Sequence, residues 1–223
     1  MYIFVGSYQN IDKRFAFYKM DEKIATDFHK RKLIEHGSKI GGQVDAFKLS
    51  FWTTPAGAVR LKRRVDICRE FIGGHGHNLR ILEIGCGSGL FSGYLKESLF
   101  AAVDISFDLI KEAKQNCAAV SFVVADAELL PFKNGSFDGI IGFSVLEYLD
   151  LQMIFSECKR LLRPGGKVLF SEPNLFNPQI AIQKSISRIK FAMKSWHRDR
   201  GFIRWLLAHK MKKNGFQIGR AHV

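Results

Sequence analysis

The chain has 223 residues, of which 47% are hydrophobic and 25% charged, which is enough for one domain with a sizeable core. Its net charge of +13 is uneven, because residues 1–80 carry +7, residues 81–183 carry −4 and residues 184–223 carry +10. No apolar run reaches the roughly eighteen residues of a membrane span, and the first residues lack the pattern of a secretion signal.

The cysteines predict neither a disulfide framework nor a zinc site. There are four of them, Cys68, Cys86, Cys117 and Cys158, and no two form a CxxC pair. We therefore expect reduced thiols, a cytoplasmic location and no metal.

Residues 1–78 are predicted to form an N-terminal helical lid or substrate segment. Helix-like spacing covers residues 12–37 and 56–72, and the glycine-rich turn at 73–78 ends the segment. A basic run, Arg60 to Arg64, lies on the second of these helices. It is either an arm over the bound ligand or the solvated face of a helix packed beside a sheet.

From residue 79 to residue 175, short apolar runs alternate with helical stretches. The strands are expected at 79–84, 100–105, 120–126, 137–144 and 167–173. The helices are expected at 89–98, 107–117 and 150–162, the last ended by the Pro-Gly-Gly of 164–166. This alternation predicts an α/β fold with a doubly wound, mostly parallel sheet and helices on both faces.

Three glycines in five residues follow the first of these strands. Gly85, Gly87 and Gly89 lie where an open parallel sheet binds its ligand, beyond the carboxyl ends of the strands. Glycines there permit positive φ and let a ligand approach the backbone. The GxGxxG pattern of dinucleotide-binding folds fails, because Leu90 occupies its third glycine position, and this disfavours a nicotinamide-dependent oxidoreductase.

Five segments of residues 83–174 occur in an order that is typical of one family. They are Glu-x-Gly-x-Gly-x-Gly at 83–89, the acidic end of "AAVDIS", then "ADAELLPF", "GSFDGIIGFSVLEYL" and "RLLRPGGKVLFSEPN". Over residues 79–175 the chain resembles the class I S-adenosylmethionine-dependent methyltransferases, in particular the small-molecule methyltransferases. The resemblance implies a Rossmann-like core, S-adenosylmethionine as cofactor and in-line methyl transfer.

The resemblance also implies which residues hold the cofactor. Asp104 would accept from the ribose hydroxyls, Asp126 from the adenine amino group, and the loop after residue 143 would pass the methionine part. The full expected set is Glu83, Gly85, Cys86, Gly87, Gly89, Asp104, Ile105, Asp126, Ala127, Phe143 and Ser144.

No catalytic residue is assigned. A sulfonium methyl group is already a strong electrophile, so positioning supplies most of the rate. A hydroxyl acceptor would profit from a base, and the candidates are Glu147, Tyr148, Glu172, His29 and His36. Tyr148 stands where the family often has histidine, and a tyrosine of ordinary pKa near 10 is a poor base at neutral pH.

Residues 176–223 are predicted to form a basic helical insert and the end of the same domain. The insert either packs on the core as a substrate lid or contacts an anionic membrane, a lipid-linked acceptor or a phosphorylated one. The terminal "IGRAHV" is typical of a translated sequencing adapter, so we expect natural sequence to end near Gln217. The final strand hairpin of the family is then expected to be missing, which would leave an edge strand unpaired.

The predicted function is methyl transfer from S-adenosylmethionine to a small-molecule or lipid-linked acceptor. Two alternatives remain: an RNA methyltransferase that uses the basic flanks, although nucleic acid is not the expected partner, and a non-catalytic methyltransferase-like partner subunit. We expect a cytoplasmic location, with peripheral contact to an anionic membrane as one reading of the basic insert, and the sequence does not set the oligomeric state.

Overall fold

The computed structural model describes residues 2–7, 54–73, 79–96, 99–174, 176 and 203–218. The helix-like stretch 12–37, with His29 and His36, and most of the basic insert lie outside these residues. The elements in chain order are β1 (Tyr2–Ser7), α3 (Pro55–Gly73), β2 (Ile81–Ile84), α4 (Leu90–Leu95), β3 (Leu99–Asp104), α5 (Phe107–Asn116), β4 (Phe122–Val124), β5 (Phe137–Phe143), η2 (Leu146–Tyr148), α6 (Leu151–Leu161), β6 (Leu162–Glu172), α8 (Arg204–Lys213) and β7 (Gln217–Ile218).

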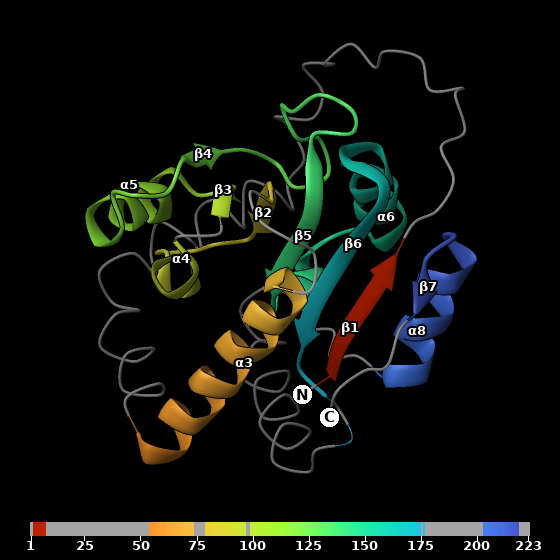
Figure 1. Cartoon of the computed structure of the whole chain (residues 1–223), viewed down its shortest axis with the longest axis horizontal. Coiled ribbons are helices and arrows are strands. Elements are labelled where there is room, and N and C mark those ends of the chain that lie inside the picture. The colour runs from red at the N-terminus through yellow and green to blue at the C-terminus, as the bar shows by residue number, and fades with distance from the viewer. Residues whose placement is uncertain are drawn as a thin grey trace, which may run out of the picture.

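The described strands form one seven-stranded sheet in the order β4-β3-β2-β5-β6-β1-β7 (Figure 1). The five strands from β4 to β6 pair in parallel, which confirms the predicted α/β fold. The chain builds outward from β2 to β4 and then returns to place β5 on the other side of β2. The strand order therefore reverses between β2 and β5, the place where such sheets bind ligands.

The expectation of an unpaired edge beside β6 is wrong. β1 pairs with β6 in antiparallel register from Tyr2 opposite Glu172 to Ser7 opposite Lys167, and β7 pairs with the outer side of β1. The helical prediction for residues 1–78 therefore does not hold at Tyr2–Ser7, which form a strand. The sequence "YIFVGS" does carry β-favouring residues, but its apolar run was too short to separate strand from helix.

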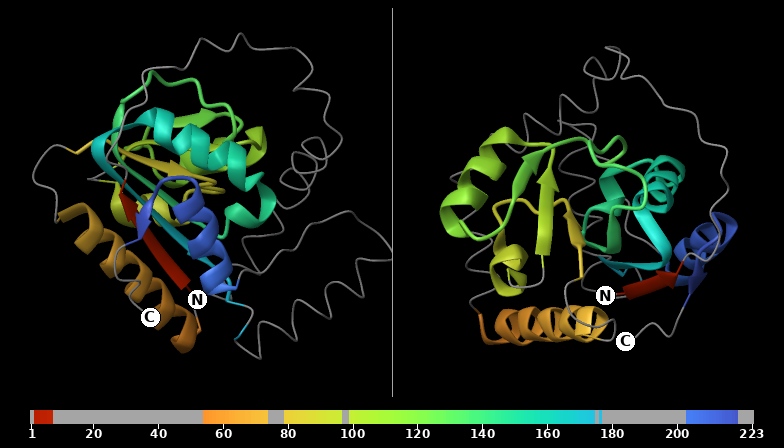
Figure 2. Two further views of the ribbon diagram at one scale, coloured as in Figure 1. Left: turned by 90° about the vertical axis from the view of Figure 1, so that its right-hand side faces the viewer. Right: turned by 45° about the horizontal axis from the view of Figure 1, so that its top comes forward.

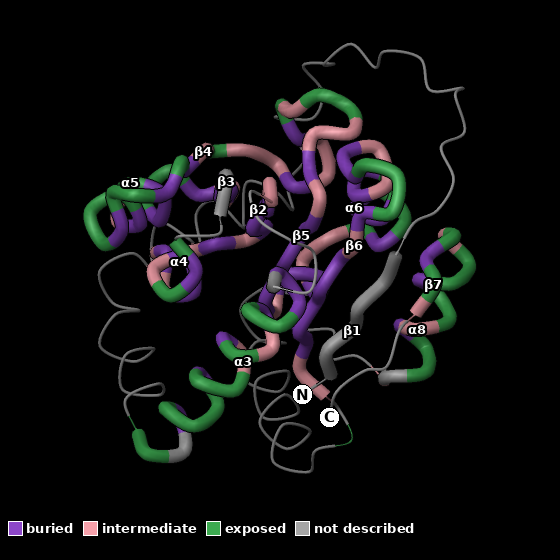
Figure 3. Tube along the Cα trace, in the orientation of Figure 1, coloured by how far each residue is buried: buried purple, intermediate pink, exposed green. Residues whose placement is uncertain are grey.

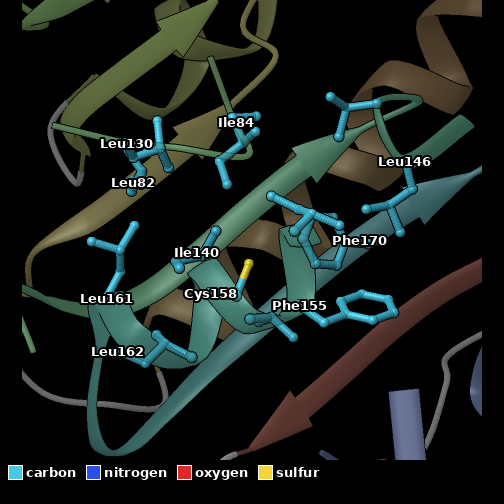
Figure 4. Packing of buried hydrophobic residues seen from close by; sticks show 14 of the residues in the cluster. Leu82, Ile84, Leu130, Ile140, Leu146, Phe155, Cys158, Leu161, Leu162 and Phe170 are labelled. Carbon is cyan, nitrogen blue, oxygen red and sulfur yellow. The ribbon is translucent and has the colours of Figure 1, made fainter. Parts of the chain in front are cut away.

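Side chains of alternate strand residues point into two separate hydrophobic cores, one on each face of the sheet. On one face Ile84, Ile140 and Phe170 pack against α6 and α8, and Figure 4 shows Phe155 and Cys158 of α6 pointing toward these strands. On the other face Ile141 and Leu169 pack with residues of α3, α4 and α5, along which buried and exposed residues alternate (Figure 3). The two further views show these helices on opposite sides of the sheet (Figure 2).

The helices begin and end where local chemistry allows. Asp150 caps α6, because its side chain accepts hydrogen bonds from the backbone N–H groups of Gln152 and Met153. The helix ends at Leu161, ahead of Pro164, and β6 starts at once because Leu162 pairs with Phe137. The predicted strand at 167–173 was thus too short at its start.

Arg160 ties α6 to the loop that follows β4. Its guanidinium donates to both carboxylate oxygens of Glu157, to the carbonyls of Leu130 and Phe132, and to the side chain of Asn134. Glu157 is itself buried and accepts from the backbone N–H of Leu130 at 2.7 Å. Removal of the guanidinium would leave a buried carboxylate and two carbonyls without this donor.

We therefore expect Arg160→Met to lower the free energy of unfolding by about 3 kcal/mol. The matched control is Arg163→Met, because Arg163 forms an exposed ion pair with Asp138 at 3.0 Å that is worth under about 1 kcal/mol. Urea unfolding of both variants measures the difference. Equal losses in the two variants would contradict the special role of Arg160.

Candidate functional site

The glycine loop lies between β2 and α4 at the carboxyl edge of the sheet. The backbone N–H groups of Gly85 and Cys86 both donate to the carbonyl of Val103 on β3, at 2.8 and 3.0 Å. Gly85 has φ of 69° and a Cβ built on it would lie 2.5 Å from a methyl group of Val145. Gly87 has φ of 53°, and a Cβ there would meet nothing within 4 Å. The loop is thus closed against the protein at Gly85 and open at Gly87.

Two carboxylates follow adjacent strands at this same edge. Asp104 ends β3, and its two oxygens accept from the backbone N–H groups of Gly87 at 2.9 Å and Ser106 at 3.0 Å. Asp126 lies just after β4, where its side chain accepts from the N–H of Glu128 at 2.9 Å. The N–H of Ala125 donates to the carbonyl of Asp104, which holds the two segments together. The structure therefore brings both predicted carboxylates to one edge.

The segment after β5 closes the other side of the glycine loop. The Phe143 ring stacks on that of Phe91, with centroids 4.1 Å apart. Ser144 has a φ of 51°, which is uncommon for a residue with a side chain and often occurs at functional sites. Glu172, at the end of β6, accepts from the N–H groups of Val145 and Leu146 at 3.1 Å each. This carboxylate anchors the loop, so a base role would compete with that contact.

Glu83 is buried beneath the glycine loop. Its carboxylate accepts a hydrogen bond from the hydroxyl of Ser92 on α4. Its neighbours in sequence, Leu82 and Ile84, point into the core on the α6 face, so the side chain of Glu83 lies on the opposite face, which α3 covers. Burial, and to a smaller extent the charge of Asp104, raise the pKa of Glu83 from 4.5 to about 7, while the Ser92 bond lowers it. A cationic group bound nearby would favour the ionised form.

The raised pKa makes a prediction about stability. The contribution of Glu83 to the free energy of unfolding is fully present below about pH 4.5 and is lost as the pH rises through about 7, because the folded state resists ionisation of this carboxyl group. We expect Glu83→Gln to match the natural chain near pH 4 and to be more stable by roughly 2 kcal/mol near pH 8. Urea unfolding at the two pH values tests this. A difference that does not change with pH would contradict it.

The cysteines of the site are poor nucleophiles. Burial, together with Glu83 and Asp104, raises the pKa of Cys86 well above its ordinary value, and burial raises the pKa of Cys68 to about 12. Cys86 therefore serves as a small buried residue of the turn. Among the described residues, no group of three or more His, Cys, Asp or Glu is placed to hold a metal ion.

The residues present fit an adenosyl cofactor. The open space above Gly87 leaves backbone accessible, and Asp104 offers carboxylate oxygens to a diol. The remaining predicted residues differ in placement: Ile105 and Ser144 are half-buried at the strand ends, whereas Ala127 is buried in the core that faces α6. Roles for all eleven residues stay predictions.

Sequence reasoning missed three residues that shape the site. Ser92 and Val145 contact Glu83 and Gly85, but no local pattern marks such partners. Arg64 was read as part of a basic run, although it lies on the buried stripe of α3 with Leu61, Val65 and Cys68. The helical spacing of these four residues could have shown it.

Comparison with known proteins shows similarity over the residues that form this core. Residues 82–170 match the family model described as a methyltransferase domain. Malonyl-[acyl-carrier protein] O-methyltransferase of Hamiltonella defensa subsp. Acyrthosiphon pisum (strain 5AT) is 33% identical over 41% of this chain and 36% of that protein. Fatty-acid O-methyltransferase of Mycolicibacterium smegmatis (strain ATCC 700084 / mc(2)155) is 32% identical over 42% of this chain and 36% of that protein.

A solved structure extends the likeness of the fold. Magnesium protoporphyrin IX methyltransferase of Synechocystis PCC 6803, solved with bound SAH, has a TM-score of 0.63 at 17% identity and covers 86% of this chain and 91% of that one. The sequence matches to the two O-methyltransferases span well under half of each relative's length. No helix of the described part of the chain is both long and apolar enough to cross a membrane.

Proposed function

Because residues 82–170 belong to the methyltransferase domain family and adopt the class I fold, we propose that this chain binds S-adenosylmethionine and methylates a small-molecule or lipid-linked acceptor. The bound cofactor would supply a methyl group activated by a sulfonium. The residues of the chain would orient that group, exclude water and align the acceptor behind the methyl carbon.

One observation carries the proposal: the convergence of the glycine loop, Asp104 and the loop after β5 at the point where the strand order reverses. Asp104 bonds the N–H of Gly87, and Val145 packs against Gly85, so three segments distant in sequence meet there. A ligand with a ribose diol and a charged amino-acid end matches the chemistry of these groups.

We propose an acceptor that carries a carboxyl group as the first class to test. The names of the two relatives above both state O-methylation of an acyl compound. A carboxylate is ionised at neutral pH, so its oxygen needs no catalytic base. This agrees with a site in which Glu172 is engaged by two backbone N–H groups and Tyr148 stands where a histidine is common in the family.

The outer face of α8 supports peripheral contact with an anionic membrane. Trp205 and Leu206 are 66% and 42% exposed at its start, and the exposed Lys210, Lys212 and Lys213 lie in its last turns. Exposed aromatic and apolar side chains next to lysines favour the interface of a negatively charged bilayer. Sedimentation with vesicles of phosphatidylglycerol and phosphatidylcholine tests this, and binding that ignores the anionic lipid would contradict it.

The test of the proposed function starts with cofactor binding. Isothermal titration of the full chain with S-adenosylhomocysteine is expected to give one site per chain. Incubation with labelled S-adenosylmethionine and a panel of fatty acids and malonyl thioesters should then give products one methyl group heavier. RNA and hydroxyl-bearing lipids complete the panel as competing acceptor classes.

Each negative result has a distinct meaning. A folded chain that binds neither S-adenosylmethionine nor its product would overturn the proposal and favour a non-catalytic partner subunit. Methylation of RNA in preference to the small acceptors, with strong loss in salt, would favour the RNA methyltransferase.

A further inference from the structure

The turn that follows β4 contains two acidic residues with different partners. The side chain of Asp126 accepts from the backbone N–H of Glu128 at 2.9 Å, and its carbonyl accepts from the N–H of Leu129 at 3.0 Å. A local turn of this kind fixes the backbone of Glu128 relative to Asp126. A ligand held by Asp126 therefore also acts on the position of Glu128.

The side chain of Glu128 reaches the start of α6. Its carboxylate accepts from the backbone N–H of Asp150 at 2.7 Å, across 22 residues of sequence. Asp150 is the N-cap of α6, and its own side chain accepts from the N–H groups of Gln152 and Met153. The N–H of an N-cap residue has no partner within its own helix, so Glu128 satisfies a donor at the helix boundary.

Glu128 provides from another segment a contact that a helix often makes by itself. In a capping box, a Glu or Gln three residues after the N-cap accepts from the N–H of the N-cap residue. That position in α6 is Met153, which is 46% exposed and whose thioether is a weak acceptor. The start of α6 therefore depends on the turn after β4 for this hydrogen bond.

Residues 144–150, which connect β5 to α6, are held at both ends by carboxylates. Near the start, Glu172 accepts from two backbone N–H groups, and at the end Glu128 accepts from that of Asp150. The short helix η2 lies between these two anchors and carries Tyr148, one of the candidate bases. The placement of this segment therefore depends on Glu128.

We propose that Glu128 is a positioning residue that couples the adenosyl site at Asp126 to residues 144–150. The inference rests on the proposed function, which places the adenine beside Asp126. A bound adenine restricts the turn after β4, and the bond from Asp150 to Glu128 then holds the next segment in one arrangement. Because coupling between two sites is reciprocal, the cofactor prepares the acceptor side, and a bound acceptor tightens the cofactor.

Adenosine tests this coupling, because it has the adenine and ribose of the cofactor but lacks the sulfur and the amino-acid end. In the proposed site it contacts Asp104 and Asp126 and does not extend to residues 144–150. We expect saturating adenosine to slow amide hydrogen exchange of residues 144–150 by about fivefold in the natural chain. In Glu128→Ala the same addition should change that exchange by less than about twofold. Mass spectrometry of peptic fragments measures both.

The variant keeps a second contact between the same two elements. The N–H of Leu130 donates to Glu157 on α6 at 2.7 Å, so loss of the Glu128 carboxylate does not detach the turn from α6. Glu128→Gln keeps an oxygen that can accept from Asp150, so it should retain most of the response to adenosine. Asp108→Ala is the matched control, because it removes an exposed carboxylate from α5 and should respond like the natural chain.

A second substitution separates coupling from helix capping. Met153→Glu in the Glu128→Ala background places a carboxylate on α6 itself, three residues after Asp150, where it can complete a capping box. This double variant should restore the exchange of residues 144–150 in the absence of ligand, but it should not restore the response to adenosine. A residue that only caps α6 would be rescued in both measurements.

Three outcomes would overturn the inference. Equal responses to adenosine in the natural chain and Glu128→Ala would remove the role of Glu128, and recovery of the response by Met153→Glu would reduce that role to a helix cap. A natural chain that binds S-adenosylhomocysteine but shows no response to adenosine at residues 144–150 would refute the coupling and leave the proposed function in place. If the natural chain bound neither ligand, the proposed function would fail together with the inference.

Discussion

Gly85→Ala is expected to destabilise the chain by about 3 kcal/mol or more, whereas Gly87→Ala should cost only about 1 kcal/mol. Both residues have positive φ, so the backbone strain of an alanine is common to the two variants. The difference comes from space. A Cβ at Gly85 would lie 2.5 Å from Val145, and Val145 is held by its N–H bond to buried Glu172, whereas a Cβ at Gly87 meets nothing.

The pair also separates folding from ligand binding. Gly87→Ala places a methyl group in the open space above the loop, so it should weaken S-adenosylhomocysteine by about tenfold or more while the fold persists. Urea unfolding and titration calorimetry on the same preparations measure the two effects. Equal stability of the variants, or unchanged ligand affinity in Gly87→Ala, would contradict the proposed orientation of the loop.

The core of the fold could be predicted from the sequence because local signals agreed. The apolar runs at 79–84 and 137–144 were short, and the segment at 107–117 carried helical spacing, and the structure has β2, β5 and α5 at nearly these residues. The glycine spacing then located the carboxyl edge. The predicted strand at 120–126 was longer than β4, which covers only Phe122–Val124 and is followed by a turn at residues 127–128.

The pairing of β1 could not be predicted in the same way. A strand of six residues at the start of the chain pairs with β6, which is more than 150 residues away in sequence, and only the sheet as a whole selects that partner. Side chains on either face follow local period, but the order of strands depends on long-range register. Pattern reasoning therefore found the parallel core and missed the antiparallel edge.

The residues that contact the site residues could not be predicted from the sequence either. Glu83 and Asp104 could be recognised in the sequence because Glu83 interrupts an apolar run and Asp104 ends one. A charged residue in such a buried pattern is uncommon. Ser92, Val145 and Arg64 became part of the site only through packing between elements. A sequence can thus name the groups that carry charge, whereas the groups that position them require the fold.

Asp104→Ala is expected to weaken binding of S-adenosylhomocysteine by about 100-fold or more. Its carboxylate has two tasks, because it accepts from the N–H of Gly87 and, in the proposed site, from the ribose hydroxyls. Hydrogen bonds to a charged acceptor are worth about 1.5–3 kcal/mol each, so losing both contacts exceeds the effect of a single neutral bond. Titration calorimetry measures the loss.

A 2′-deoxy form of 5′-methylthioadenosine identifies which task dominates. If Asp104 holds the ribose, the natural chain should bind the deoxy ligand more weakly than its parent, and Asp104→Ala should bind the two alike, because removal of either partner breaks the same contact. Asp108→Ala is the matched control, since this carboxylate is exposed in the first turn of α5 and should leave every affinity unchanged. Full discrimination between the two ligands in Asp104→Ala would leave Asp104 only the task of shaping the loop. The ribose contact, and with it the placement of the cofactor along β3, would then be wrong.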